Sequence, residues 1–176
     1  MVKIAKFFGY LFFFLAMVLF FLPKVELFYL AEKQLEPLKV VISNEKLHDS
    51  GFSLDLQDAK VYFEGIESAN IEQLKISPWV FINRVTLKNI RLSHAAKSFV
   101  PLDVEFLELS YHLFNPVAVN IYAKGGFGEL RGKLDLINTS VTLSLNPSSK
   151  MTKEYAHTLR NLKKEKTGEY SYAKDL

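Results

Sequence analysis

Most of the chain beyond residue 37 alternates apolar with polar side chains. Residues 117–124 read VAVNIYAK, in which valine, isoleucine and alanine occupy every second position. The same period of two recurs over residues 38–43, 52–56, 60–63, 71–76, 85–92, 104–111, 130–136 and 141–145. Each run predicts a strand with one apolar face, and no helical period separates the runs. The pattern therefore indicates one antiparallel sheet of about eight strands instead of a βαβ fold.

Local breaks in this pattern predict finer features. Between Leu87 and Ile90 the apolar phase shifts by one residue, which predicts a β-bulge near Asn89. Residues 137–140 separate two alternating runs and predict a four-residue hairpin connection. A sheet with one apolar face must close, fold over or be covered. We therefore expect a mainly β fold, with a twisted or folded-over sheet that forms a groove or half-barrel.

The N-terminal region departs from the alternating pattern. Residues 7–22 contain no charge and hold 7 of the 15 Phe. As a helix, residues 4–22 would measure ~28 Å, close to the hydrocarbon thickness of a bilayer. A cleaved signal peptide would need a shorter apolar core followed by small residues, and a buried helix would keep a polar face. We therefore predict an uncleaved transmembrane signal anchor, whose membrane-embedded residues are Phe7, Phe8, Leu11, Phe12, Phe13, Phe14, Leu15, Val18, Leu19, Phe20, Phe21 and Leu22.

Basic residues decide the predicted orientation of this anchor. Lys3 and Lys6 precede the apolar core, whereas basic and acidic residues are mixed after it. The positive-inside rule then places the N-terminus in the cytoplasm and the rest of the chain outside it. In a bacterium with two membranes, this predicts a single-pass protein of the inner membrane with its bulk in the periplasm.

Two further segments show a helical period. Residues 24–36 carry one apolar stripe that Pro37 ends, which predicts a short juxtamembrane helix covering one end of the sheet. A helix lying on the bilayer is the alternative, but the nearly balanced charges of this segment disfavour it. Beyond Pro147, a second stripe predicts a C-terminal amphipathic helix and then a short final strand. The stripe consists of Met151, Tyr155, Leu159 and Leu162.

Charge is concentrated at the C-terminal end. Residues 147–176 hold 7 basic and 4 acidic side chains, which accounts for the net charge of +3. A packed surface helix with solvated lysines is expected here over a helix that binds lipid or nucleic acid. The chain is thus divided into a cytoplasmic tip and anchor (1–23), a juxtamembrane helix (24–37), an antiparallel β domain (38–146) and a basic helical tail (147–176).

Residue types that carry out chemistry are scattered. The chain has no Cys, which excludes disulfides, zinc ribbons and thiol catalysis. Its four His follow no metal-ligand spacing, and Ser93-His94 lacks the glycine frame of a nucleophile elbow. Residues 124–128 (KGGFG) match no phosphate-binding frame and predict a turn. No catalytic, cofactor-binding or metal-binding residue is therefore assigned, no cofactor is expected, and an enzyme is the least favoured class. For Trp79, core packing and a membrane-interface anchor both stay open.

The order of these segments resembles a known group of proteins. A one-pass anchor, a helix opened by Leu22-Pro23 and a continuous β run are similar to the AsmA-like envelope proteins and, in that style, the type II secretion protein N family. The likeness rests on residues 50–56, 71–77 and 128–136. The resemblance implies a non-enzymatic inner-membrane protein with a periplasmic sheet and a role in envelope assembly, secretion or lipid handling.

Two classes of function follow from these expectations. The first is a structural or interaction component in envelope biogenesis or secretion, whose partners are the membrane bilayer and other envelope or secretion proteins. The second is a module for lipid binding or lipid transport, whose apolar groove takes an acyl lipid. Nucleic acid is not expected as a partner, because the bulk of the chain is predicted to lie outside the cytoplasm.

Overall fold

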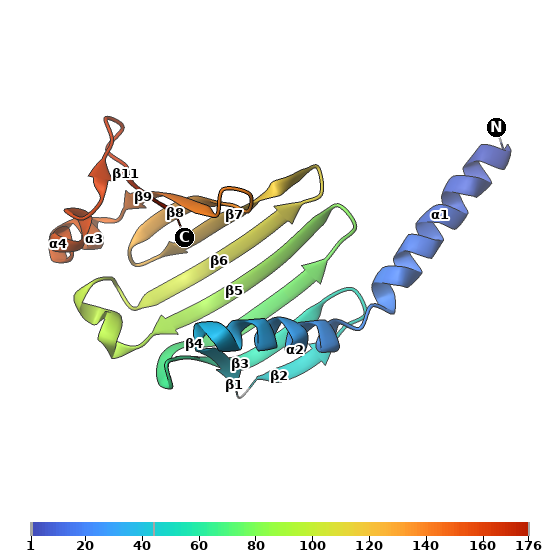
Figure 1. Ribbon diagram of the computed structural model, residues 1–176, viewed down its shortest axis with the longest axis horizontal. Coiled ribbons are helices and arrows are strands. Elements are labelled where there is room, and N and C mark those ends of the chain that lie inside the picture. Colours follow the sequence, from blue (N-terminus) through green and yellow to red (C-terminus); the bar gives the residue numbers. More distant parts are fainter. Residues whose placement is uncertain (1, 44, 176) are drawn as a thin grey trace.

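The computed structural model describes residues 2–43 and 45–175. One long helix, α1 (Val2–Phe20), projects from one end of a large β-sheet (Figure 1). Among the described residues, α1 is the helix long and apolar enough to cross a membrane. The strands are β1 (Val40–Ser43), β2 (Lys46–Asp49), β3 (Leu54–Phe63), β4 (Ile66–Pro78), β5 (Ile82–Leu92), β6 (Asp103–His112), β7 (Asn115–Gly125), β8 (Gly128–Asp135), β9 (Ser140–Pro147), β10 (Lys163–Lys164) and β11 (Tyr170–Asp175).

These strands form one antiparallel sheet, which confirms the predicted mainly β class. Over the described residues the order is β1-β3-β4-β5-β6-β7-β8-β9-β11-β10, and β2 also pairs with β3. β1 pairs with residues 60–63 of β3 and β2 pairs with residues 54–57, so β1 and β2 follow one another along the same edge. The runs 52–56 and 60–63, predicted as separate strands, belong to the single strand β3. The alternation did not predict β2 or β10, because both are short and mostly charged.

The predicted hairpin connection lies one residue earlier than expected. Asp135 of β8 pairs with Ser140 of β9, so residues 136–139 form the connection. The Asp135 carboxylate accepts the backbone N–H groups of Ile137 and Asn138, each at 2.9 Å. These hydrogen bonds lower the pKa of Asp135 from its usual value, because they favour the charged form.

Apolar side chains gather on one face of the sheet. Leu56 of β3 pairs with Leu74 of β4, Leu74 with Leu87 of β5, and Leu87 with Leu107 of β6. Ala123 of β7 continues this row. Because side chains alternate between faces along a strand, polar and charged residues of the same strands occupy the opposite face. Several of them form ion pairs between neighbouring strands there.

The phase shift near Asn89 is shared by neighbouring strands. Asn89 has a left-handed backbone with φ of 52°, and Asp58 of β3 has φ of 57°. Asn89 Nδ2 donates to Glu72 Oε2 at 2.8 Å across the sheet. The β4–β5 ladder shows no shift in register, because the alternation of apolar and polar side chains changes phase in both strands between the pairs Ile71–Ile90 and Gln73–Lys88. The predicted bulge at Asn89 is therefore a bend of several strands together, and a register shift follows between β6 and β7 at Val104.

The short helix predicted after the anchor is present as α2 (Lys24–Leu35), followed by a 3-10 turn, η1 (Glu36–Leu38). Figure 1 shows α2 lying across the sheet near the β1 edge. Its Phe28 is 5% exposed and joins the core with Leu54 and Leu56 of β3. The helix therefore covers the apolar face at this edge of the sheet.

A single C-terminal amphipathic helix is not confirmed. The segment forms two short helices, α3 (Ser149–Glu154) and α4 (Ala156–Leu159), with a break at Tyr155. The predicted stripe is nevertheless apolar core, because Met151, Tyr155 and Leu159 are all buried. The short final strand is present as β11.

Tertiary hydrogen bonds explain the break between α3 and α4. His157 Nε2 lies 2.6 Å from the carbonyl oxygen of Ser98, and Thr158 Oγ1 donates to the carbonyl of Phe99 at 2.6 Å. Both carbonyls belong to the β5–β6 connection, which contains a 3-10 turn, η2 (His94–Ser98). These contacts fix the direction of α4 independently of α3. The helices α3 and α4 thus cover part of the end of the sheet remote from α1, which we call the distal end.

Candidate functional site

Lys24 holds the junction between α1 and the sheet. Its side chain is 2% exposed, and its Nζ atom lies 3.4 Å from Oδ1 of Asp49, the last residue of β2. Nζ also donates to the carbonyl oxygens of Phe20 at 3.3 Å and Leu22 at 3.1 Å. Carbonyls at a helix C-terminus have no donor within the helix, and a cation there also interacts favourably with the helix dipole. Lys24 thus caps α1 and ties it to the sheet.

Aromatic rings extend this junction. The ring of Phe20 meets Phe52 edge-on with centroids 5.6 Å apart, and Phe52 stacks on Trp79 at 6.1 Å. Gly51 allows the approach of Phe20, since a Cβ at Gly51 would overlap the Phe20 ring. Trp79 lies in the β4–β5 turn and is 53% exposed. It is therefore not a core residue, which was one of the two places that the sequence left open.

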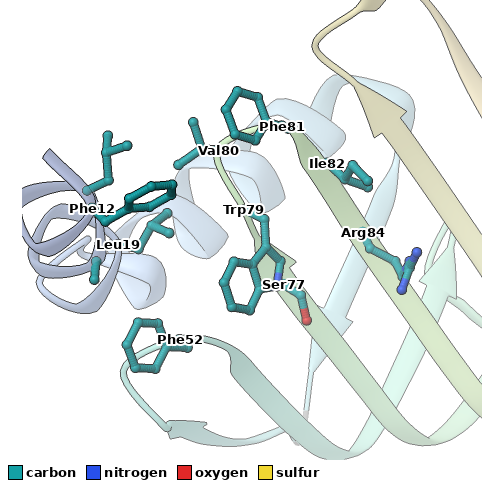
Figure 2. Close-up of a pocket in the computed structure, with 11 residues that line it drawn as sticks. Phe12, Leu19, Phe52, Ser77, Trp79, Val80, Phe81, Ile82 and Arg84 are labelled. Atoms are coloured by element: carbon teal, nitrogen blue, oxygen red, sulfur yellow. The ribbon is translucent and has the colours of Figure 1, made fainter. Parts of the chain in front are cut away.

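A cleft of about 480 Å³ lies between α1 and the β4–β5 turn. Figure 2 shows side chains of α1 on one side and those of the turn on the other, with Arg84 at the edge. Arg84 Nε pairs with Glu108 Oε1 at 3.3 Å. The residues that line the cleft are Phe12, Leu15, Ala16, Leu19, Phe52, Ser77, Trp79, Val80, Phe81, Ile82 and Arg84. This lining is mostly apolar and offers few polar groups for recognising a polar ligand.

The apolar face of the sheet is unevenly covered. Under α2, Leu54 and Leu56 are almost completely buried, and at the distal end Met151 of α3 and Leu159 of α4 pack into the same core. Towards the α1 end of β6–β9 the side chains on the same face are only half-buried. We call these residues the open patch; they are Leu109, Val119, Ile121, Leu134, Val141 and Leu143. Register makes the patch continuous, because Leu109 pairs with Ile121 and Leu134 pairs with both Val119 and Val141.

The residues considered for chemistry stay apart. Ser93 precedes the 3-10 turn that His94 begins. Within residues 2–43 and 45–175, no three His, Cys, Asp or Glu side chains lie close enough to hold a metal ion. The glycine cluster forms the β7–β8 turn, as predicted, and Gly128 takes a φ of 116° there. These positions offer no assembled site for catalysis or cofactor binding in the part of the chain described.

The predicted anchor residues lie on α1 and directly after it. Most of the helix is exposed, with Phe7, Phe12, Phe13 and Phe14 each more than 60% exposed. Leu15, Ala16 and Leu19, which line the cleft, are half-buried. The importance of Lys24 and of the open patch was not predicted. Lys24 has the sequence signature of an ordinary flanking lysine, and the alternation of β6–β9 does not distinguish a covered apolar face from an uncovered one.

Comparison with protein-family models, with curated proteins and with solved structures gives no match. The fold and the site therefore define the class by themselves. This is a mainly β protein with a single antiparallel sheet, and its N-terminal helix is long and apolar enough to span a membrane.

Proposed function

We propose that the protein is a membrane-anchored, non-enzymatic module that binds lipid acyl chains against the apolar face of its sheet. The observation that carries the proposal is the open patch, which lies on the same face that α2, α3 and α4 bury elsewhere. A contiguous apolar surface of this kind marks an interaction site. In this role the sheet acts as a groove or half-barrel around the lipid acyl chain.

The surroundings of the open patch favour an acyl chain as its occupant. The patch lies towards the end of the sheet where α1 begins to cross the bilayer. The cleft beside α1 is itself lined mostly by apolar side chains. A lipid tail needs an apolar track and few polar partners, and both surfaces meet that requirement.

The proposed location follows from the same anchor. The helix α1 spans the inner membrane, Lys3 and Lys6 stay in the cytoplasm, and the sheet lies in the periplasm. This arrangement agrees with the resemblance to AsmA-like proteins, which remains a prediction. Two reporter enzymes are fused to the C-terminus in separate experiments, one that is active only outside the cytoplasm and one that is active only inside it. We expect activity from the first reporter alone. Activity of a reporter that works only in the cytoplasm would reverse the orientation.

A structural role in an envelope or secretion complex is the second candidate. One edge of the sheet, formed by β1 and β2, carries no further strand among the described residues. An unpaired edge offers backbone N–H and C=O groups to a strand from a partner. In this role the open patch would be covered by an envelope or secretion protein instead of by lipid.

Photo-crosslinking of the full chain in vesicles separates these two functions. The vesicles contain a phospholipid with a diazirine near the end of one acyl chain, and mass spectrometry maps the labelled residues. We expect label on the open patch as well as on α1. Ile121→Asn should abolish the label on the patch, whereas Tyr122→Asn, on the opposite face of β7, should leave it unchanged.

Label on α1 shows that the anchor is in the bilayer in each sample. If α1 is labelled and the open patch of the wild-type chain is not, acyl-chain binding is wrong and the structural role becomes the better explanation. Equal labelling of the two faces of β7 would also contradict the proposal, since it would mean contact without a defined site.

A further inference from the structure

The turns at the α1 end of the sheet expose large apolar side chains. Within the described residues, each of the four turns β2–β3, β4–β5, β6–β7 and β8–β9 carries at least one. Phe114 is 84% exposed and Ile137 is 72% exposed. We call this set the rim; it consists of Phe52, Trp79, Phe81, Leu113, Phe114 and Ile137.

Contacts join the β2–β3, β4–β5 and β6–β7 turns into one surface. Phe81 stacks on Phe114 with ring centroids 5.6 Å apart and planes 11° apart. The backbone N–H of Leu113 donates to the carbonyl of Phe81 at 2.9 Å. On the other side, Trp79 stacks on Phe52, which meets Phe20 of α1. The rim therefore continues directly from the helix that can span a membrane.

The position of the β4–β5 turn along α1 sets the depth of that turn relative to the bilayer. Trp79, Val80 and Phe81 line a common cleft with Phe12 and Leu19. At 1.5 Å rise per residue, Phe12 lies ~12 Å from the end of α1 at Phe20. If α1 spans the bilayer, a turn beside this stretch lies at the level of the bilayer and not above it.

From this arrangement we propose that the rim is a membrane-docking surface. The four turns insert their aromatic and aliphatic side chains into the interface of the same bilayer that α1 crosses. Tryptophan and other aromatic rings favour the boundary between headgroups and acyl chains. The inference rests on α1 being a membrane anchor, which is part of the proposed function, but it does not require acyl chains to bind the open patch.

Polar groups near the rim are compatible with this position. Lys24 and Asp49 satisfy each other at the junction, and Asp135 is held by the N–H groups of its own turn. The distal end also exposes Phe63, Ile66 and Phe99. They lie at the opposite end of the strands, where an exposed Lys39–Glu64 ion pair with atoms 2.7 Å apart also stands. The distal end is therefore the matched negative control.

Tryptophan fluorescence tests the docking in the full chain. Trp79 is the single Trp, so the wild-type protein in vesicles reports on the β4–β5 turn without any substitution. In a Trp79→Phe background, Phe114→Trp and Ile137→Trp move the probe to two other turns of the rim. Phe99→Trp in the same background moves it to the distal end. Each protein is measured with phospholipids brominated on the acyl chain and, separately, with acrylamide in the water.

We expect brominated lipid to quench Trp79 and both rim probes at least several-fold more strongly than the Phe99→Trp probe, and acrylamide to show the reverse order. If the Phe114→Trp and Ile137→Trp probes behave like the distal probe, the docking surface is wrong even when Trp79 itself is quenched. If acrylamide quenches wild-type Trp79 and brominated lipid does not, the β4–β5 turn lies in water. The proposal then fails without reliance on any variant. Quenching of the rim probes without crosslinking of the open patch would support the docking surface and contradict acyl-chain binding alone.

Discussion

Replacing Lys24 by Met should loosen the junction between α1 and the sheet. The substitution keeps the unbranched apolar stem but removes the ammonium group that donates to the carbonyls of Phe20 and Leu22. It also takes away the cation that lies 3.4 Å from Asp49. The end of β2 then loses its polar attachment to the end of α1, whereas the contacts of the Phe20 ring with Gly51 and Phe52 remain.

The magnitude follows from the partners and their exposure. Hydrogen bonds from a charged group contribute about 1.5–3 kcal/mol when the partners are buried. The Asp49 side chain is 34% exposed, so the ion pair itself adds only about 0–1 kcal/mol after solvent screening. The distances to the two carbonyls, 3.1 and 3.3 Å, are at the long end of the range for such bonds. Together these terms amount to about 2–3 kcal/mol for local opening of the junction.

Hydrogen exchange of the full chain in nanodiscs measures this opening. A loss of about 2–3 kcal/mol speeds exchange roughly 30- to 150-fold, because about 1.4 kcal/mol corresponds to a factor of ten. The acceleration should be confined to the backbone amides of residues 20–22, 24 and 50–53. Lys33→Met is the matched control, since Lys33 is an exposed residue of the same helix α2.

Asp49→Asn completes a double-mutant cycle. It removes the negative charge but keeps an oxygen that can accept the N–H of Gly51. In the wild-type chain this N–H donates to Asp49 Oδ1 at 2.8 Å. If Lys24 and Asp49 interact, the double variant costs less than the sum of the two single variants. The reasoning is refuted if Lys24→Met exchanges within about threefold of Lys33→Met at the junction amides.

Two further predictions concern the two ends of the sheet. Leu159→Ala at the distal end should lower the free energy of unfolding by about 2–5 kcal/mol, because Leu159 is 4% exposed in the core. The urea midpoint of the full chain in detergent measures this change. A loss comparable to that of an exposed leucine would contradict the packing of α4 in the core. Asp135→Ala should destabilise the β8–β9 turn at neutral pH. Since hydrogen bonds from the backbone N–H groups of Asn138 and Ile137 lower the pKa of Asp135 below its usual value, the difference from wild type should persist above that usual value. It should vanish as the pH falls through the lowered pKa. A difference in thermal midpoint that grows on acidification would refute this assignment.

Local pattern was sufficient to predict the sheet and the anchor. Alternation with a period of two depends only on which side chains point the same way along one strand, so residues 85–92 and 104–111 predicted β5 and β6 directly. The uncharged run of residues 7–22 likewise predicted a long apolar helix, because hydrophobic thickness is a matter of length and composition. The position of Asn89 was also predictable, since the apolar phase of its own strand changes there.

Contacts between distant residues could not be predicted in this way. Lys24 pairs with Asp49 of β2, 25 residues further along the chain, and the break at Tyr155 depends on carbonyls of the β5–β6 connection. The phase change at Asn89 could be a bulge of one strand or a bend shared by several strands, and only the register of the neighbouring strands distinguishes the two. The separation of α3 from α4 similarly reflects packing that overrides the helical period of the segment.

The apolar sheet face and the apolar N-terminal helix were therefore predictable from the order of the amino acids, since both depend on neighbouring residues. Which part of that face stays open depends on tertiary structure, because α2, α3 and α4 cover the face through contacts with strands that are distant in the sequence. Tertiary structure also places the turns that carry Phe52, Trp79, Phe114 and Ile137 at one end of the sheet. Every second turn of an antiparallel meander returns to the same end of the sheet, but strand length and register determine whether those turns lie beside α1.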